Sequence, residues 1–172
     1  VLKQTTARLP WLLIGMIGGI GNSMILGNFD ATFAAHPEMA LYIPLIGGTG
    51  GNVGTQSSAI IVQGLANSSL DAKNTFKQVT KEAIVALINA TIISLLVYTY
   101  NFIRFGATAT VTYSVSISLF AVVMFASIFG TLVPMTLEKL KIDPAIATGP
   151  FIAITNDIIG MMLYMGITVL LS

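Results

Sequence analysis

The sequence contains no cysteine and few charged residues, and each shortage excludes a class of protein. Without cysteine the chain has no disulfides, no thiolate metal ligands and no cysteine nucleophile. Charged residues make up 9% of the 172 residues, against about 25% in a typical soluble domain. The formal net charge of +1 provides no basic face for phosphates, so we expect no nucleic-acid partner. With 55% hydrophobic residues, the composition indicates a protein embedded in a lipid bilayer.

Long apolar runs divide the chain into segments that could cross a membrane. A spanning helix needs roughly 20 mostly apolar residues. The predicted fold is therefore all-α, one integral-membrane domain over residues 1–172. Its five transmembrane helices are predicted at residues 9–29, 39–66, 83–103, 111–137 and 144–171.

The basic residues are distributed unevenly between the predicted loops. Arg104 follows the third span, whereas the other basic residues all fall on the opposite side: Lys3, Arg8, Lys73, Lys77, Lys81, Lys139 and Lys141. Positively charged loops face the cytoplasm. We therefore predict a multi-pass protein of the plasma (inner) membrane with a cytoplasmic amino terminus and an external carboxyl terminus.

One acidic residue, Asp157, does not belong to a loop. The other acids fall in loops or at span edges: Asp30, Glu38, Asp71, Glu82, Glu138 and Asp143. Asp157 is halfway along the last predicted span, about 20 Å from either end at 1.5 Å per residue. A carboxylate at that depth is costly and normally faces a cavity, a partner or a pore. The alternative is a protonated Asp157 that is hydrogen-bonded to a neighbouring threonine or asparagine.

Small residues accompany this acid along its own span. At spacings of three or four residues, they form one helical stripe that comprises Gly149, Ala153, Asp157, Gly160 and Tyr164. Small side chains let another helix approach closely, or leave open space. A tight helix contact and a pore lining both remain open on this pattern. We expect Gly149-Pro150 to interrupt the helical hydrogen bonds, because proline has no N–H.

The second span combines glycines with neutral polar groups. Five glycines fall within residues 47–54, which predicts a poor helix. A membrane segment tolerates such backbone only where protein or a watery cavity covers its polar groups. Amide and hydroxyl side chains share one helical face: Thr49, Asn52, Gln56 and Gln63. Close packing of the glycines is the alternative, but the polar groups favour a permeation path.

Carboxylate, carbonyl and amide oxygens are hard ligands, which suit Mg²⁺, Ca²⁺ or Mn²⁺. Mg²⁺ gives up its water reluctantly, so a channel could hold the hydrated ion beside Asp157. Two copies of Asp157 across a twofold axis would double the negative charge there.

In these motifs the sequence resembles the transmembrane domain of the MgtE family of magnesium channels and transporters. The resemblance rests on Arg8-Leu9-Pro10-Trp11-Leu12, on Pro44 with residues 50–56, on residues 62–66 and 143–145, and on Gly149-Pro150-Phe151 and Thr155-Asn156-Asp157. It implies a homodimer with a pore along its axis, lined by the second and fifth spans. Hydrated Mg²⁺ would pass down its electrochemical gradient into the cytoplasm.

The resemblance also implies roles for individual residues. The metal site would comprise Asp157, Ala153, Asn52 and Gly48, and the pore would be lined further by Thr49, Gly51, Gln56 and Gly149. The family's cytoplasmic amino-terminal and CBS domains have no counterpart in this sequence. Because the chain begins at Val1, we expect it to be part of a longer protein with a cytoplasmic regulatory region.

Enzymes and coupled transporters are the other classes of function to compare with a channel. We expect no enzyme: the only histidine, His36, lies in a loop with Glu38, and one chain supplies a single intramembrane acid. A proton- or sodium-coupled divalent cation transporter remains the alternative to a channel, because a lone midplane acid can also carry a proton. Gly15, Gly18, Gly19 and Gly21 are interpreted as helix-packing positions.

Overall fold

The chain folds into a bundle of long helices. A computed structural model describes residues 2–71 and 74–172, and every regular element within them is helical. In chain order these are α1 (Leu2–Gly27), α2 (Asp30–Ala35), the 3₁₀ helix η1 (Pro37–Tyr42), α3 (Ile43–Ala66), α4 (Thr75–Phe105), α5 (Thr110–Lys139) and α6 (Pro144–Leu171). The all-α prediction is confirmed for the described residues. Lys73, one of the basic residues that predict the orientation, lies outside them.

The five long helices occupy the five predicted spans, with differences at their ends. The second predicted span begins as η1, and α3 starts only at Ile43. Pro44 lies in the first turn of α3. Proline is tolerated there, because an N–H in the first turn of a helix has no acceptor within the helix. The helix α4 extends the third span in both directions, to Thr75 and Phe105. The last span has the predicted bounds, because the Asp143 side chain accepts a hydrogen bond from the Ala145 amide and caps α6.

Four helices are long and apolar enough to cross a membrane: Leu2–Gly27, Thr75–Phe105, Thr110–Lys139 and, within α6, Thr148–Leu171. The helix α3 falls short because glycines and amides replace apolar residues along it. Exposed leucines and isoleucines cover α1 and α4, as expected where helices face lipid. Four of the five predicted spans thus correspond to helices of sufficient length and hydropathy, and the crossing of α3 remains a prediction.

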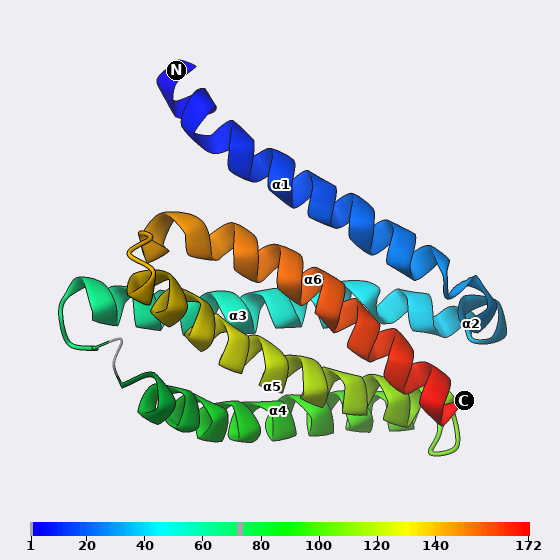
Figure 1. The fold of residues 1–172 in the computed structure, drawn as a ribbon. Helices are drawn as coiled ribbons and strands as arrows, with labels where there is room; N and C mark the ends of the chain where they lie inside the picture. Colours follow the sequence, from blue (N-terminus) through cyan, green and yellow to red (C-terminus); the bar gives the residue numbers. More distant parts are fainter. Residues whose placement is uncertain (1, 72–73) are drawn as a thin grey trace.

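The helix α5 is the centre of the bundle, packed against α3, α4 and α6 (Figure 1). Its Leu119, Val122 and Val123 are buried together with Ile46 of α3 and Tyr164 of α6. The helix α1 lies outside this group and packs chiefly against α6, where Gly18 meets Ile154. Gly15, Gly19 and Gly21 have no neighbour within 4 Å of a Cβ position, so Gly18 is the one packing position among the four glycines interpreted in this way.

Hydrogen bonds tie η1 to the ends of two helices. The Tyr164 hydroxyl donates to the Met39 carbonyl oxygen at 2.7 Å. The Tyr42 hydroxyl donates to the side-chain oxygen of Asn101, which is fully buried on α4. Since a buried polar group is costly unless it is paired, these contacts fix the connection between α2 and α3 against the bundle.

The glycine-rich α3 is a continuous helix, so the expectation of a poor helix is wrong. Tertiary packing outweighs the low helix propensity. A Cβ at Gly50 would lie 2.8 Å from Val122 of α5, and a Cβ at Gly130 would lie 2.6 Å from the Gly54 carbonyl oxygen. At Pro150 the helical hydrogen bond from residue 150 is missing, as expected for proline, but α6 continues through it without a break.

The glycines of α3 nevertheless fall into two groups. Gly50 and Gly54 are buried and allow close helix contact, and Gly64 is buried against Leu70 in the turn after α3. Gly48 and Gly51 have open space where a side chain would be. Packing therefore accounts for only part of the glycine pattern.

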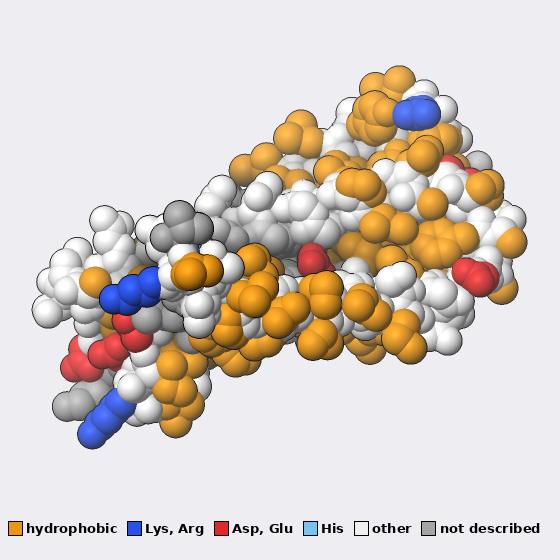
Figure 2. All heavy atoms as spheres, turned by 90° about the horizontal axis from the view of Figure 1, so that it is seen from above, with side chains coloured by type: hydrophobic (Ala, Val, Ile, Leu, Met, Phe, Trp, Pro, Cys, Tyr) orange, Lys and Arg blue, Asp and Glu red, His pale blue; other side chains and the backbone are white. Residues whose placement is uncertain are grey.

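Charged side chains gather mainly toward the two ends of the face shown in Figure 2, and hydrophobic groups cover much of the surface between them. An acidic group is nevertheless visible between the two ends. The distribution is that of a membrane protein whose ends lie in water.

Candidate functional site

Asp157 lies at the middle of α6, half-buried against α3. Its Oδ1 is 3.9 Å from the position that a Cβ on Gly47 would occupy. Within residues 2–71 and 74–172, no group hydrogen-bonds to this carboxylate and no cation lies within 4 Å of it. The structure thus gives no support to a protonated Asp157 that staples two helices of one chain.

The residues predicted to surround Asp157 lie on two exposed stripes. On α3, Gly48, Asn52 and Gln56 are exposed and follow one another at intervals of four residues. On α6, Gly149 and Ala153 are exposed and lie two turns and one turn before Asp157. Residues at this spacing share a helix face, so each helix presents one uncovered stripe.

The two stripes lie beside the line along which α3 packs against α6, which we call the seam. Gly47 lies next to Met161, whereas Gly54 lies next to Ile152. The two helices therefore run antiparallel, and the start of α3 is level with Asp157. Thr49 and Gly51 are partly exposed.

Within one chain, the seam carries a single acidic side chain, Asp157. Among the described residues, no group of three or more His, Cys, Asp or Glu side chains could hold a metal ion. Asp157 supplies the carboxylate, and the exposed stripe of α3 carries the amide of Asn52. One carboxylate with neutral oxygens suits a cation that keeps its water, since Mg²⁺ is usually bound by one or two carboxylates.

A second acid within the bundle was missed by the sequence reasoning, which placed Glu82 at a span edge. Glu82 lies inside α4, where its Oε1 accepts a hydrogen bond from Ser57 of α3 at 2.6 Å and another from Ser127 of α5. Both serines are buried. These residues are 25 and 45 positions from Glu82, so no local sequence pattern could indicate the cluster. It joins three helices and, within the described residues, includes no cation.

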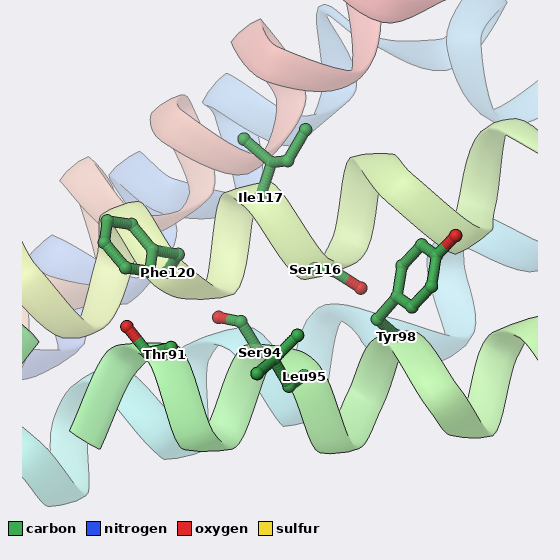
Figure 3. Close-up of a pocket in the computed structure, with 7 residues that line it drawn as sticks. All are labelled: Thr91, Ser94, Leu95, Tyr98, Ser116, Ile117 and Phe120. Carbon is green, nitrogen blue, oxygen red and sulfur yellow. The ribbon is translucent and has the colours of Figure 1, made fainter. Parts of the chain in front are cut away.

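Other features do not resemble an ion site. A groove of about 290 Å³ between α4 and α5 is lined by Thr91, Ser94, Leu95, Tyr98, Ser116, Ile117 and Phe120 (Figure 3). It contains no ionisable carboxylate and is mainly apolar, which suits an acyl chain better than a cation. In the connection before α3, His36 Nδ1 lies 3.6 Å from Glu38 Oε1. That pair supplies only two possible ligands.

Comparison with known proteins identifies the family of this chain. The model of the MgtE family, described as divalent cation transporters, matches residues 43–167. This match covers α3 to α6 almost completely. The chain belongs to the MgtE family. The resemblance seen in the sequence motifs is thereby confirmed.

Curated relatives within the family carry the name magnesium transporter MgtE. The protein from Bacillus subtilis is 32% identical over 160 residues, 93% of this chain and 35% of the relative. The protein from Thermus thermophilus is 32% identical over 165 residues, 96% of this chain and 36% of the relative. The chain thus spans about a third of the relatives it matches. MgtE proteins are described as transporters, which agrees with the prediction that the chain is not an enzyme.

Proposed function

We propose that this chain is the membrane-embedded conducting domain of a magnesium channel. The observation that carries the proposal is Asp157: a carboxylate at the middle of α6, without a partner in the described part of its own chain, beside the uncovered stripes of α3 and α6. A charge so placed within a membrane normally faces a watery path. The name shared by the relatives supports Mg²⁺ as the transported ion.

The pore forms between two copies of the chain. The exposed stripes bear small or polar residues, Gly48, Asn52, Gln56, Gly149 and Ala153, which are poorly suited to lipid. Pairing across a twofold axis turns them toward a shared path and brings the two Asp157 carboxylates to it. All five long helices then cross the bilayer, because α3 is shielded from lipid by the second copy.

In this arrangement the ion keeps its water shell. Asp157, Asn52 and the backbone at Gly48 and Ala153 accept hydrogen bonds from that water, and Thr49, Gly51, Gln56 and Gly149 line the path. Mg²⁺ enters the cytoplasm down its electrochemical gradient. This chain spans about a third of its relatives, and the cytoplasmic regulatory region of the whole protein corresponds to their remaining length.

Flux into liposomes tests this function. The chain is reconstituted, and uptake of Mg²⁺, Ca²⁺ and Mn²⁺ is measured separately with an internal indicator, against empty liposomes. A channel gives uptake driven by the membrane potential, with Mg²⁺ preferred. Uptake that requires a proton or sodium gradient would instead identify a coupled transporter, which a lone acid at the middle of the membrane also allows. No uptake of any of the three ions would overturn the proposal.

A further inference from the structure

Asn156 precedes Asp157 and faces a different part of the bundle. Successive residues of an α-helix point about 100° apart, so the two side chains cannot share one face. Asn156 is 1% exposed, whereas Asp157 is half-buried. The asparagine is therefore inside the protein at the level where the acid reaches the seam.

The Asn156 amide is bonded to the backbone of the neighbouring helix. Its Nδ2 donates to the Gly50 carbonyl oxygen at 3.0 Å. Within α3 that carbonyl also lies in the helical hydrogen-bond ladder, so the amide uses its remaining acceptor capacity. The bond fixes both the rotation of α6 and its position along α3 at this point.

The amide fits because Gly54 has no side chain. A Cβ at Gly54 would collide with Asn156 Nδ2. Gly54 is itself packed against α5, since a Cβ at Gly130 would approach the Gly54 carbonyl oxygen to 2.6 Å. The Asn156 side chain is thus held closely between α6 and a part of α3 that is packed against α5. A side chain packed this closely cannot change its rotamer without separating the helices.

The other end of the amide has no partner. Asn156 Oδ1 is buried without a hydrogen bond among the described residues. An unpaired buried acceptor destabilises a protein, whereas an apolar residue of similar size would avoid that penalty. The amide at this position is therefore better explained by what its donor holds in place than by packing alone.

We propose that Asn156 is a positioning residue for the ion path, an inference that rests on the proposed function. Its bond to Gly50 holds the face of α6 on which Asp157 lies toward Gly47 and the uncovered stripe of α3. Without the bond, α6 is free to rotate, and the carboxylate no longer lies at a fixed distance from the path. Ion binding then weakens and discriminates less between cations.

The test compares Asn156→Leu with the wild-type chain in liposomes. Leucine fills a similar volume but cannot donate. We expect the half-saturating Mg²⁺ concentration to rise by roughly tenfold, because a tenfold change corresponds to the free energy of about one hydrogen bond. We also expect the preference for Mg²⁺ over Ca²⁺ to fall. Flux is measured per inserted protein, and thermal stability is measured separately. A merely structural role would lower stability and leave both ion parameters unchanged.

A second pair of variants covers the case in which Asn156→Leu does not fold. Gly54→Ala displaces the Asn156 amide from the other helix, and Asn156→Ala removes the closest of the contacts that the new methyl group would make. Ile152 Cγ2 would still lie 2.8 Å from that methyl group. The double variant should therefore lose less than the sum of the two single variants. Gly166→Ala, which has open space around its Cβ position, is the control for a glycine change.

The outcomes separate the two proposals. Wild-type chain that carries none of the ions overturns the proposed function and this inference with it. Wild-type flux together with unchanged half-saturation and ion preference in the Asn156 variants overturns this inference alone. Additive effects of Gly54→Ala and Asn156→Ala would likewise contradict it.

Discussion

The Asp157 carboxylate faces the backbone of Gly47: its Oδ1 lies 3.9 Å from the place that a Cβ on that glycine would take. At Gly47, α3 thus offers the acid no side chain. With no intrachain hydrogen bond or ion pair in the described part of the chain, its charge remains available to a ligand. The charge and the space beside it lead to separate predictions.

Replacement of Asp157 by asparagine tests the charge. Asn keeps the size and polarity of the side chain but cannot attract a cation at a distance. We expect Mg²⁺ flux to fall by at least about tenfold, which corresponds to about 1.4 kcal/mol of lost interaction. Flux is measured in liposomes, and size-exclusion chromatography checks that the variant still inserts and assembles. Asp157→Asn with wild-type flux would show that the acid is not part of the path.

Bulky side chains test the path itself. Gly48 has no neighbour within 4 Å of its Cβ position and Ala153 is exposed, so tryptophan at either site is accommodated by a single chain. We expect Gly48→Trp and Ala153→Trp to block conduction with little change in thermal stability. Gly19→Trp on α1, which also has open space, is the matched control and should conduct normally. Equal conduction by all three variants would place the path elsewhere.

The helices and the depth of Asp157 could be predicted from the sequence because both follow from local patterns. Apolar runs of span length define α1, α4, α5 and α6, and one acid interrupts the last of them. The regular helix at residues 47–54 could not be predicted in this way. Its stability comes from contacts such as Gly54 against Gly130, which are 76 positions apart.

The candidate site was predictable only in part, for the same reason. Helical spacing identified part of the exposed stripes of α3 and α6, because residues at i and i+4 share a face. On α6 the predicted stripe is exposed only before Asp157, since Gly160 and Tyr164 are buried. The contacts behind those stripes depend on which helices are neighbours. The bond from Asn156 to Gly50 joins positions 106 apart, and the serine partners of Glu82 lie on two other helices.

Substitution of Glu82 tests the three-helix cluster. Glu82→Leu removes the carboxylate acceptor, so the buried hydroxyls of Ser57 and Ser127 have only each other as hydrogen-bond partners, at 3.0 Å. We expect a loss of about 3 kcal/mol in unfolding free energy, since two hydrogen bonds to a charged group are lost and each contributes about 1.5–3 kcal/mol. Glu82→Gln, whose amide oxygen still accepts, should lose less. Chemical denaturation in detergent measures both.

Glu138→Leu is the matched control for that change. Glu138 is exposed near the end of α5, and surface substitutions usually change stability by less than about 0.5 kcal/mol. Similar losses for Glu82→Leu and Glu138→Leu would mean that the cluster does not stabilise the bundle.

The absence of cysteine allows a direct test of the predicted orientation. Thr108 lies in the loop between α4 and α5, and Ile142 lies in the loop between α5 and α6, and both are exposed. The basic residues predict that the first loop is external and the second cytoplasmic. A membrane-impermeant maleimide should therefore label Thr108→Cys in intact cells, and Ile142→Cys only after permeabilisation. The cysteine-free parent gives the background. Labelling of both variants in intact cells would mean that α5 does not cross the bilayer, whereas the reverse pattern would place the amino terminus outside.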